Sequence, residues 1–253
     1  MKKAELAALL WAALPALAQT PPASGSTSGA TDKDGRMRVQ ISAQQQTTLS
    51  AELAAKIASL PFKEGDSFKA GQTLVAFDCS LFRAQLNKAQ AQTDAARQIL
   101  RVNKRLAELN SISNLEVEQA EAKVKETEAE VGAMRVTVSK CSLGAPFSGR
   151  VAKVLAENHQ YVPQGKPLLD IMDTSRLEVK LIVPSRWLAW LAKGTRFSVH
   201  VDDLNKDYVA RVTRTGARID PVSQSVSLAG EIESSPAELL PGMSGWAAFK
   251  PPK

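Results

Sequence analysis

The longest regular pattern of hydrophobic and polar positions lies in the middle of the chain. From Leu81 to Val138 there is no proline, Gly132 is the only glycine, and Ala, Gln, Glu, Lys and Arg dominate. Such a composition favours helix. Apolar or small residues recur there at alternating steps of three and four, first at Phe82, Leu86, Ala89, Thr93, Ala96, Leu100 and Asn103, then at Val117, Ala120, Val124, Thr127, Val131, Met134 and Val138. Each series predicts a heptad seam.

The two seams are separated by a polar break in the sequence LNSISNLEVE. Ser113 followed three positions later by Glu116 is the pattern of a capping box, which marks the start of a helix. We therefore expect helices at about 81–109 and 113–139, forming an antiparallel coiled-coil hairpin over residues 81–140. Each arm would be about 40 Å long at 1.5 Å per residue.

The segments on either side of this hairpin repeat each other. Shifting 56–78 by 94 positions places Lys56 on Arg150 and Gly71 on Gly165, with the apolar positions in register. This indicates an internal repeat of a short β-unit. We expect turns at Gly65, Gly71 and Gly165, and a further turn at Gly149 where the chain leaves the hairpin. The two halves, residues 51–80 and 141–174, would pack as a small β-sandwich.

The last third of the chain alternates short apolar runs with turn residues. Strands are expected at 177–183, 196–201, 208–215, 225–232 and 244–249. A short helix should begin at Pro184 and stop at Gly194, with Trp187 and Trp190 packing it against the strands. Residues 175–253 therefore predict a small β-barrel. We expect residues 37–50 to complete it as an N-terminal strand, for which RMRVQIS at 36–42 is the candidate.

The N-terminus has the form of an export signal. Lys2 and Lys3 precede an apolar stretch of about 12 residues that is too short to span a bilayer. We expect a cleaved signal peptide at 1–18, a flexible linker at 19–36 and a protein exported to a periplasm. No later segment reads as a membrane span.

Charge and motifs exclude several classes of function. The net charge of +6 comes from basic residues interleaved with acids, without a basic face carrying aromatics, so no nucleic-acid partner is expected. His159 and His200 stand in unrelated contexts, and no catalytic or nucleotide-binding motif occurs. We expect a protein that is not an enzyme, with no cofactor and no metal site.

The two cysteines bracket the predicted hairpin. Cys79 precedes the first helix and Cys141 follows the second. The two ends of an antiparallel hairpin meet, and an oxidising compartment favours a disulfide there. The alternative is a pair of free buried thiols.

Several blocks in this order resemble one known family. EGDSFKAGQTLVAFD precedes the hairpin, APFSGRVAKV follows it, and LLDIMDTSRLEVKLIVPSRWLAWLAKGTRFSV and LLPGMSGWAAF come later. Together they resemble the membrane fusion proteins, or periplasmic adaptors, of tripartite efflux pumps (the HlyD/RND-type family). The resemblance implies a split lipoyl-like β-sandwich. A carrier domain is not expected, because helices occupy the junction where carriers present a modified lysine.

The resemblance also implies partners. It predicts an adaptor that links an inner-membrane transporter, RND-type, to a TolC-like outer-membrane channel and that self-associates into a ring. In the family, an arginine and a leucine on the first helix and a serine opening the second dock the hairpin tip on the channel. Arg105, Leu109 and Ser113 match these in type and order, with a shorter turn between them.

Two other functions stay open. One is an adaptor of type I (ABC) protein secretion, and the other is an envelope structural or interaction protein without a pump. Since the chain stops about ten residues after Met243, we also expect the family's membrane-proximal domain to be missing or vestigial.

Overall fold

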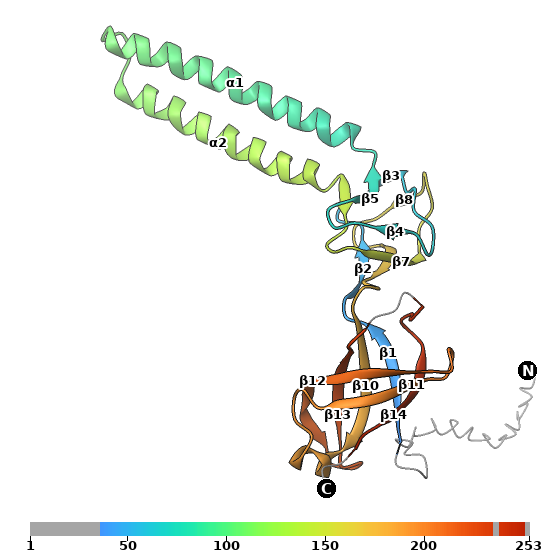
Figure 1. The fold of residues 1–253 in the computed structure, drawn as a ribbon. Helices are drawn as coiled ribbons and strands as arrows, with labels where there is room; N and C mark the ends of the chain where they lie inside the picture. Colours follow the sequence, from blue (N-terminus) through green and yellow to red (C-terminus); the bar gives the residue numbers. More distant parts are fainter. Residues whose placement is uncertain (1–35, 235–237, 251–253) are drawn as a thin grey trace, which may run out of the picture.

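The computed structural model describes residues 36–234 and 238–250, so the expected signal peptide and nearly all of the expected linker lie outside the described residues. The described chain forms three parts in a row (Figure 1). A helical hairpin projects from a small β-sandwich, and a β-barrel lies on the other side of that sandwich. The predicted class, mixed β with an inserted α-helical hairpin, is confirmed.

The hairpin consists of α1 (Ser80–Glu108) and α2 (Asn114–Ser139), close to the predicted bounds. The buried residues of both helices fall on the predicted seams: Ala89, Thr93, Ala96, Ala120, Val124, Thr127 and Val131. Most are small, which lets the helices approach closely. Two ion pairs join the arms outside this seam, Arg97–Glu128 at 2.7 Å and Lys104–Glu121 at 2.8 Å.

The sandwich is made of two four-stranded sheets. One has the order β2 (Gln46–Ser50), β9 (Pro167–Met172), β7 (Gly149–Val154) and β4 (Ser67–Phe68). The other has the order β6 (Ser142–Gly144), β5 (Thr73–Phe77), β3 (Ala55–Ser59) and β8 (Tyr161–Val162). Large side chains from both sheets fill the space between them, among them Ile57, Leu74, Leu168, Leu169 and Ile171.

The predicted internal repeat is confirmed strand by strand. The offset of 94 places β4 on β8, and it places β3 on β7 and β5 on β9 within one residue at either end. The two halves interlock, because β4 of the first half pairs with β7 and β8 of the second half pairs with β3. Each sheet therefore needs strands from both sides of the hairpin.

One predicted boundary is wrong. Residues 37–50 were expected to belong to the barrel, but the barrel strand β1 (Met37–Ala43) ends at Ala43, and β2 pairs with β9 in the sandwich. The internal repeat explains why β2 lies there. A shift of 94 residues brings β2 onto the region of β6, and the two strands have equivalent neighbours, β9 for β2 and β5 for β6. The first half of the sandwich thus begins at Gln46 rather than at residue 51.

The turn residues follow the repeat with one exception. Gly65, Gly71 and Gly165 have φ of 89°, 77° and 84°, and His159, the counterpart of Gly65, also has a positive φ of 65°. Gly149 is not a turn residue as expected but the first residue of β7. Glycine is required there for another reason, since a Cβ would lie 2.1 Å from the carbonyl oxygen of Met172.

The barrel is closed by six strands in the order β1, β10 (Leu177–Pro184), β13 (Ser225–Ile232), β12 (Lys206–Asp220), β11 (Arg196–Val201) and β14 (Ser244–Ala248). The predicted N-terminal strand is β1, between β10 and β14. β12 is longer than predicted because it stays paired with β13, through two register shifts, beyond the end of its pairing with β11. The expected helix is a 3-10 helix, η1 (Ser185–Ala189), which ends well before Gly194, and Pro184 belongs to β10.

Candidate docking site at the hairpin tip

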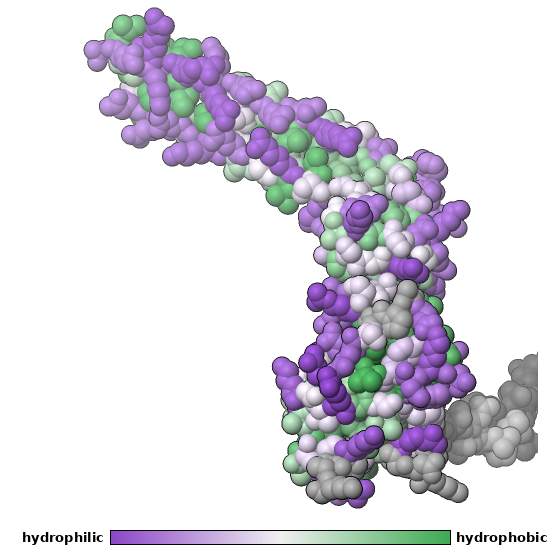
Figure 2. Space-filling model, viewed as in Figure 1, coloured by the Kyte–Doolittle hydropathy of each residue, from purple (hydrophilic) through white to green (hydrophobic). Residues whose placement is uncertain are grey.

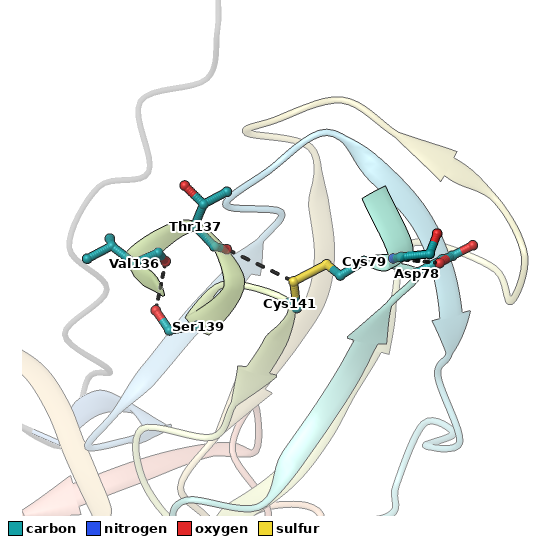
Figure 3. The surroundings of a disulfide bond; sticks show 7 residues. Asp78, Cys79, Val136, Thr137, Ser139 and Cys141 are labelled. Carbon is teal, nitrogen blue, oxygen red and sulfur yellow. Dashed lines mark hydrogen bonds between the residues drawn. A yellow bond between two sulfur atoms is a disulfide. The ribbon is translucent and has the colours of Figure 1, made fainter. Parts of the chain in front are cut away.

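The base of the hairpin is tied by a disulfide between Cys79 and Cys141 (Figure 3). Their Cα atoms are 6.0 Å apart across a sequence separation of 62, and both side chains are buried beneath the helices. The bond therefore lies where both helices join the sandwich. It joins the connection between β5 and α1 to the connection between α2 and β6.

The first helix is capped beside this disulfide by an acid. Cys79 occupies the N-cap position but offers no side-chain hydrogen bond. Instead, Asp78 Oδ1 accepts a hydrogen bond from the backbone N–H of Ser80 at 3.1 Å. This bond, strengthened by one from the Ser80 side chain, lowers the pKa of Asp78 below its ordinary value. A carboxylate at a helix N-terminus also interacts favourably with the helix dipole.

The opposite end of the hairpin closes with a turn that contains no glycine. Asn110 takes the left-handed conformation with φ 55°. Its N–H donates to Ala107 O at 2.9 Å, and the N–H of Ser111 donates to Leu106 O at 2.8 Å. These bonds satisfy carbonyls at the end of α1. The turn at the tip is therefore held by two backbone hydrogen bonds to the end of α1.

Ser113 opens α2 through the predicted capping box. Its Oγ accepts from the backbone N–H of Glu116 and donates to Glu116 Oε2 at 3.1 Å, while its own N–H donates to Oε2 at 2.8 Å. The hydroxyl is thus already engaged within the chain. Its first role in this structure is to start the helix, and any contact with a partner would come in addition.

Arg105 and Leu109 are exposed at the same tip. Arg105 lies in the last turn of α1, where a cation complements the helix dipole, and it makes no ion pair with any other described residue. Leu109 is 68% exposed. The structure thus places the three predicted docking residues at one end of the hairpin. Their contact with a channel stays a prediction.

Sequence reasoning missed further apolar residues near this tip. Leu115, in the first turn of α2, is 61% exposed, and Ile99 and Val102 on α1 are 57% and 47% exposed. Hydrophobic residues interrupt the hydrophilic surface of the outer part of the hairpin in Figure 2. The signal was present in the sequence, because 99, 102 and 109 follow a helical spacing distinct from the buried seam. We call Leu109 and Leu115, which flank the turn, the tip patch.

Side chains that could bind a metal ion are scattered over the described residues. These residues contain no group of three or more His, Cys, Asp or Glu side chains placed to hold a metal ion. His200 contacts Asp207 on the barrel surface, with 2.9 Å between Nδ1 and Oδ1, and His159 lies in a turn of the sandwich. No helix in the described part of the chain is long and apolar enough to cross a bilayer.

Comparison with known proteins agrees with this architecture. A family model described as the alpha-helical hairpin domain of RND MFP matches residues 79–143. The solvent efflux pump periplasmic linker SrpA of Pseudomonas putida is 25% identical over 87% of this chain and 61% of its own length. The multidrug resistance protein MdtA of Shigella boydii is 32% identical over 62% of this chain and 41% of its own length.

A solved structure shows the same fold. A MacA–MexA chimeric protein that contains the alpha-hairpin domain of Pseudomonas aeruginosa MexA superposes with a TM-score of 0.72. The two share 18% identity, and the match covers 83% of this chain and 78% of the chimera.

A split sandwich that carries a helical hairpin beside a closed barrel is the architecture that this chain shares with the chimera. The hairpin of this chain matches the hairpin domain of membrane fusion proteins, and relatives that include named periplasmic linkers of efflux pumps are similar to most of its length. The chain spans between about half and about three fifths of the length of the first curated relatives that it matches.

Proposed function

We propose that this chain is a non-catalytic periplasmic adaptor that links an inner-membrane transporter, of the RND type, to a TolC-like outer-membrane channel for efflux. The observation that carries the proposal is the position of the hairpin tip. It lies at the end of the molecule opposite the barrel (Figure 1), with Arg105 and the tip patch exposed on it. Such an arrangement suits a protein that contacts two partners lying far apart.

The hairpin has the mechanical properties that bridging requires. Each arm is about 40 Å long, from a rise of 1.5 Å per residue over 29 residues in α1 and 26 in α2. Helix–helix packing, two ion pairs between the arms and the disulfide at the base hold the arms together. These contacts hold the two arms together along their length and fix both at the sandwich.

The tip has the chemistry of a small docking element. Leu109 and Leu115 can insert into grooves between helices of a channel, as apolar anchors of helical ligands do. The guanidinium of Arg105 can form hydrogen bonds with exposed carbonyl or carboxylate oxygens. Ser113 contributes chiefly by fixing the turn, because its hydroxyl is engaged in the capping box.

Relatives support the location and the partners. SrpA is named a periplasmic linker of a solvent efflux pump, and TtgG of Pseudomonas putida a periplasmic linker of a toluene efflux pump. By analogy, this chain would act as a periplasmic linker of an efflux pump. Partners in the inner and outer membranes and side-by-side assembly into a ring are proposed from the family resemblance of the sequence.

Charge reversal at the tip tests the proposal. In cells that express the native transporter and channel, the adaptor is cross-linked and purified, and the amount of channel recovered is measured. Arg105→Glu should reduce the recovered channel by about tenfold, the loss expected of one central polar contact. Lys88→Glu, the same change near the base of α1, is the matched control and should change nothing. Equal recovery with Arg105→Glu and Lys88→Glu would contradict the docking role.

A further inference from the structure

The end of the barrel that faces away from the sandwich forms a surface of its own. It is built from the connection between β10 and β11 (184–196), the turn between β12 and β13 (217–225), residues 248–250 and Arg36. These segments are tied together, since Ser185 N–H donates to Gln224 O and Gly194 N–H donates to Val212 O, both at 2.8 Å. We call this surface the barrel base.

Apolar side chains project from the barrel base at two places. Val222 is 93% exposed at the β12–β13 turn, and Ile219 beside it is 47% exposed. On the neighbouring connection Leu188 is 38% exposed, and Trp187 and Trp190 are half-buried. Their inner faces pack against Phe249, whose ring centroid is 5.4 Å from that of Trp187. The tryptophans are thus anchored to the barrel and partly open to solvent.

The turn that presents Val222 is held in one shape. Asp220 Oδ1 accepts hydrogen bonds from the N–H groups of Val222 and Ser223 at 3.0 and 2.8 Å and from the Ser223 hydroxyl at 3.0 Å. A branched apolar side chain is therefore kept in water by a rigid turn. This costs hydrophobic free energy in the isolated protein, so the arrangement favours an apolar contact outside the chain.

The barrel base is rich in basic residues. Its basic residues are Arg36, Arg186, Lys193, Arg196, Arg218 and Lys250, whereas Asp220 is the only acid in the segments that define it. That carboxylate is occupied by the turn. Arg196 pairs with Glu233, but Arg186, Lys193 and Arg218 form no ion pair with another described residue. The surface therefore has a net positive charge in the region around Trp187, Leu188 and Val222.

We propose that the barrel base is a membrane-docking surface that rests on the anionic headgroups of a bilayer. Tryptophan rings with one polar edge collect at the membrane–water interface, short apolar side chains insert into it, and surrounding arginines and lysines bind anionic lipid. An anionic bilayer neutralises scattered cations of this kind without a fixed pattern of partner residues.

The position of the barrel base fits this role. The barrel and the hairpin lie at opposite ends of the molecule (Figure 1). A barrel resting on one membrane would therefore direct the hairpin away from that membrane, toward a partner across the periplasm. This inference goes beyond the proposed function, because it assigns a ligand class to a surface that the hairpin does not share.

Vesicle binding tests the inference without channel or transporter. The full chain is mixed with vesicles of phosphatidylethanolamine and phosphatidylglycerol, or of phosphatidylcholine alone, and the bound fraction is measured by flotation. We expect binding to the anionic vesicles and at least about tenfold weaker binding to the neutral ones. Arg186→Glu with Lys193→Glu should lower binding to anionic vesicles by about tenfold or more. Val222→Asp should lower it as well.

The matched control places the same charge change elsewhere. Lys88→Glu with Lys125→Glu alters the hairpin by the same net charge and should leave vesicle binding unchanged. All variants are prepared with the same residues 1–35, so that any contribution of that segment is common to them, and circular dichroism verifies that each is folded. Equal binding of the base and hairpin variants, or no binding to anionic vesicles, would overturn the inference. Binding that appears only when a membrane protein is reconstituted would also overturn it, in favour of a protein partner.

Failure of this experiment leaves the channel-docking proposal intact, because Arg105 lies on the hairpin rather than on the barrel. Conversely, an adaptor that binds vesicles but shows no tip-dependent recovery of a channel would refute the proposed function alone.

Discussion

Cys79 and Cys141 are 62 positions apart in the sequence, yet their Cα atoms lie 6.0 Å apart at the base of the hairpin. Cys79 directly precedes α1, and a single residue, Lys140, separates Cys141 from the end of α2. Everything between them is the helical arm, and the sequence on either side completes one sandwich. The pair therefore marks the point at which the arm is fixed to the rest of the molecule.

Removing this disulfide should destabilise the sandwich and the hairpin together. Cross-linking a loop of 62 residues restricts the unfolded chain, which is worth roughly 4 kcal/mol in the chain-entropy description. The variant with both Cys79→Ser and Cys141→Ser should unfold at lower denaturant concentration, as followed by helical circular dichroism. Alkylation of the native, unreduced protein should find no free thiol. Two reactive thiols, or an unchanged midpoint, would contradict the prediction.

Replacing Gly149 should disturb the sandwich at a single contact. A Cβ at this position would lie 2.1 Å from Met172 O and 2.9 Å from Met172 C, so β7 and β9 would have to separate. We expect Gly149→Ala to lower the free energy of unfolding by about 1–3 kcal/mol, the range for overpacking. Gly132→Ala is the control, because it meets nothing within 4 Å on an exposed helix and should stabilise by about 0.5–1 kcal/mol. Similar effects of the two substitutions would show that the close contact is not maintained.

Ser113 can be tested for its two possible roles separately. Ser113→Ala removes the capping box and should cost about 1 kcal/mol, with faster hydrogen exchange in the first turn of α2. Ser113→Asp keeps an N-cap acceptor and should restore protection there. If channel recovery follows protection in both variants, Ser113 acts by fixing the tip. Loss of the channel with Ser113→Asp despite restored protection would instead show direct contact through the hydroxyl.

A pH effect is expected where β12 holds the segment that leads into β14. Lys206 Nζ lies 2.8 Å from Glu238 Oε2, and the Tyr208 hydroxyl donates to Glu238 Oε1 at 2.8 Å. The Lys206 hydrogen bond, followed by that of Tyr208, lowers the pKa of Glu238 below the ordinary glutamate value of 4.5. The resulting stabilisation is therefore complete above pH 4.5 and is lost as the pH falls through the lower, folded-state pKa.

A carboxyl titration by NMR measures this directly. Glu238 should titrate below the ordinary glutamate value, and Lys206→Met should raise its pKa back toward that value. Lys153→Met, which removes an exposed lysine of the sandwich, should have no effect on Glu238. A Glu238 pKa that is the same with and without Lys206 would show that the contact does not form in solution.

The sequence predicted the hairpin and the sandwich well because both repeat. Heptad spacing identified the buried residues of α1 and α2, and Ser113 with Glu116 located the start of α2. The offset of 94 aligned strands that lie on both sides of the hairpin. Regular spacing of this kind is imposed by packing, so it can be read from the chain alone.

The errors fall where packing leaves a weak pattern. β2 has the sequence QTTLS, and none of its residues is buried, so no alternation distinguishes a barrel strand from a sandwich strand. Gly149 was read as a turn because glycine favours turns, whereas its role depends on Met172, which is remote in sequence. Ile99 and Val102 were overlooked because the buried seam provided the stronger pattern on α1.

The central claim, that the hairpin tip docks on an outer-membrane channel, is tested most directly by cross-linking at two matched leucines. Leu109 at the tip is 68% exposed and Leu81 at the base of the same helix is 64% exposed. A photoreactive amino acid is placed at either position in cells, and the adducts are identified by mass spectrometry after irradiation. The account predicts a channel adduct from position 109 and none from position 81. A channel adduct from position 81 alone, or none from position 109 while the channel is present, would contradict it.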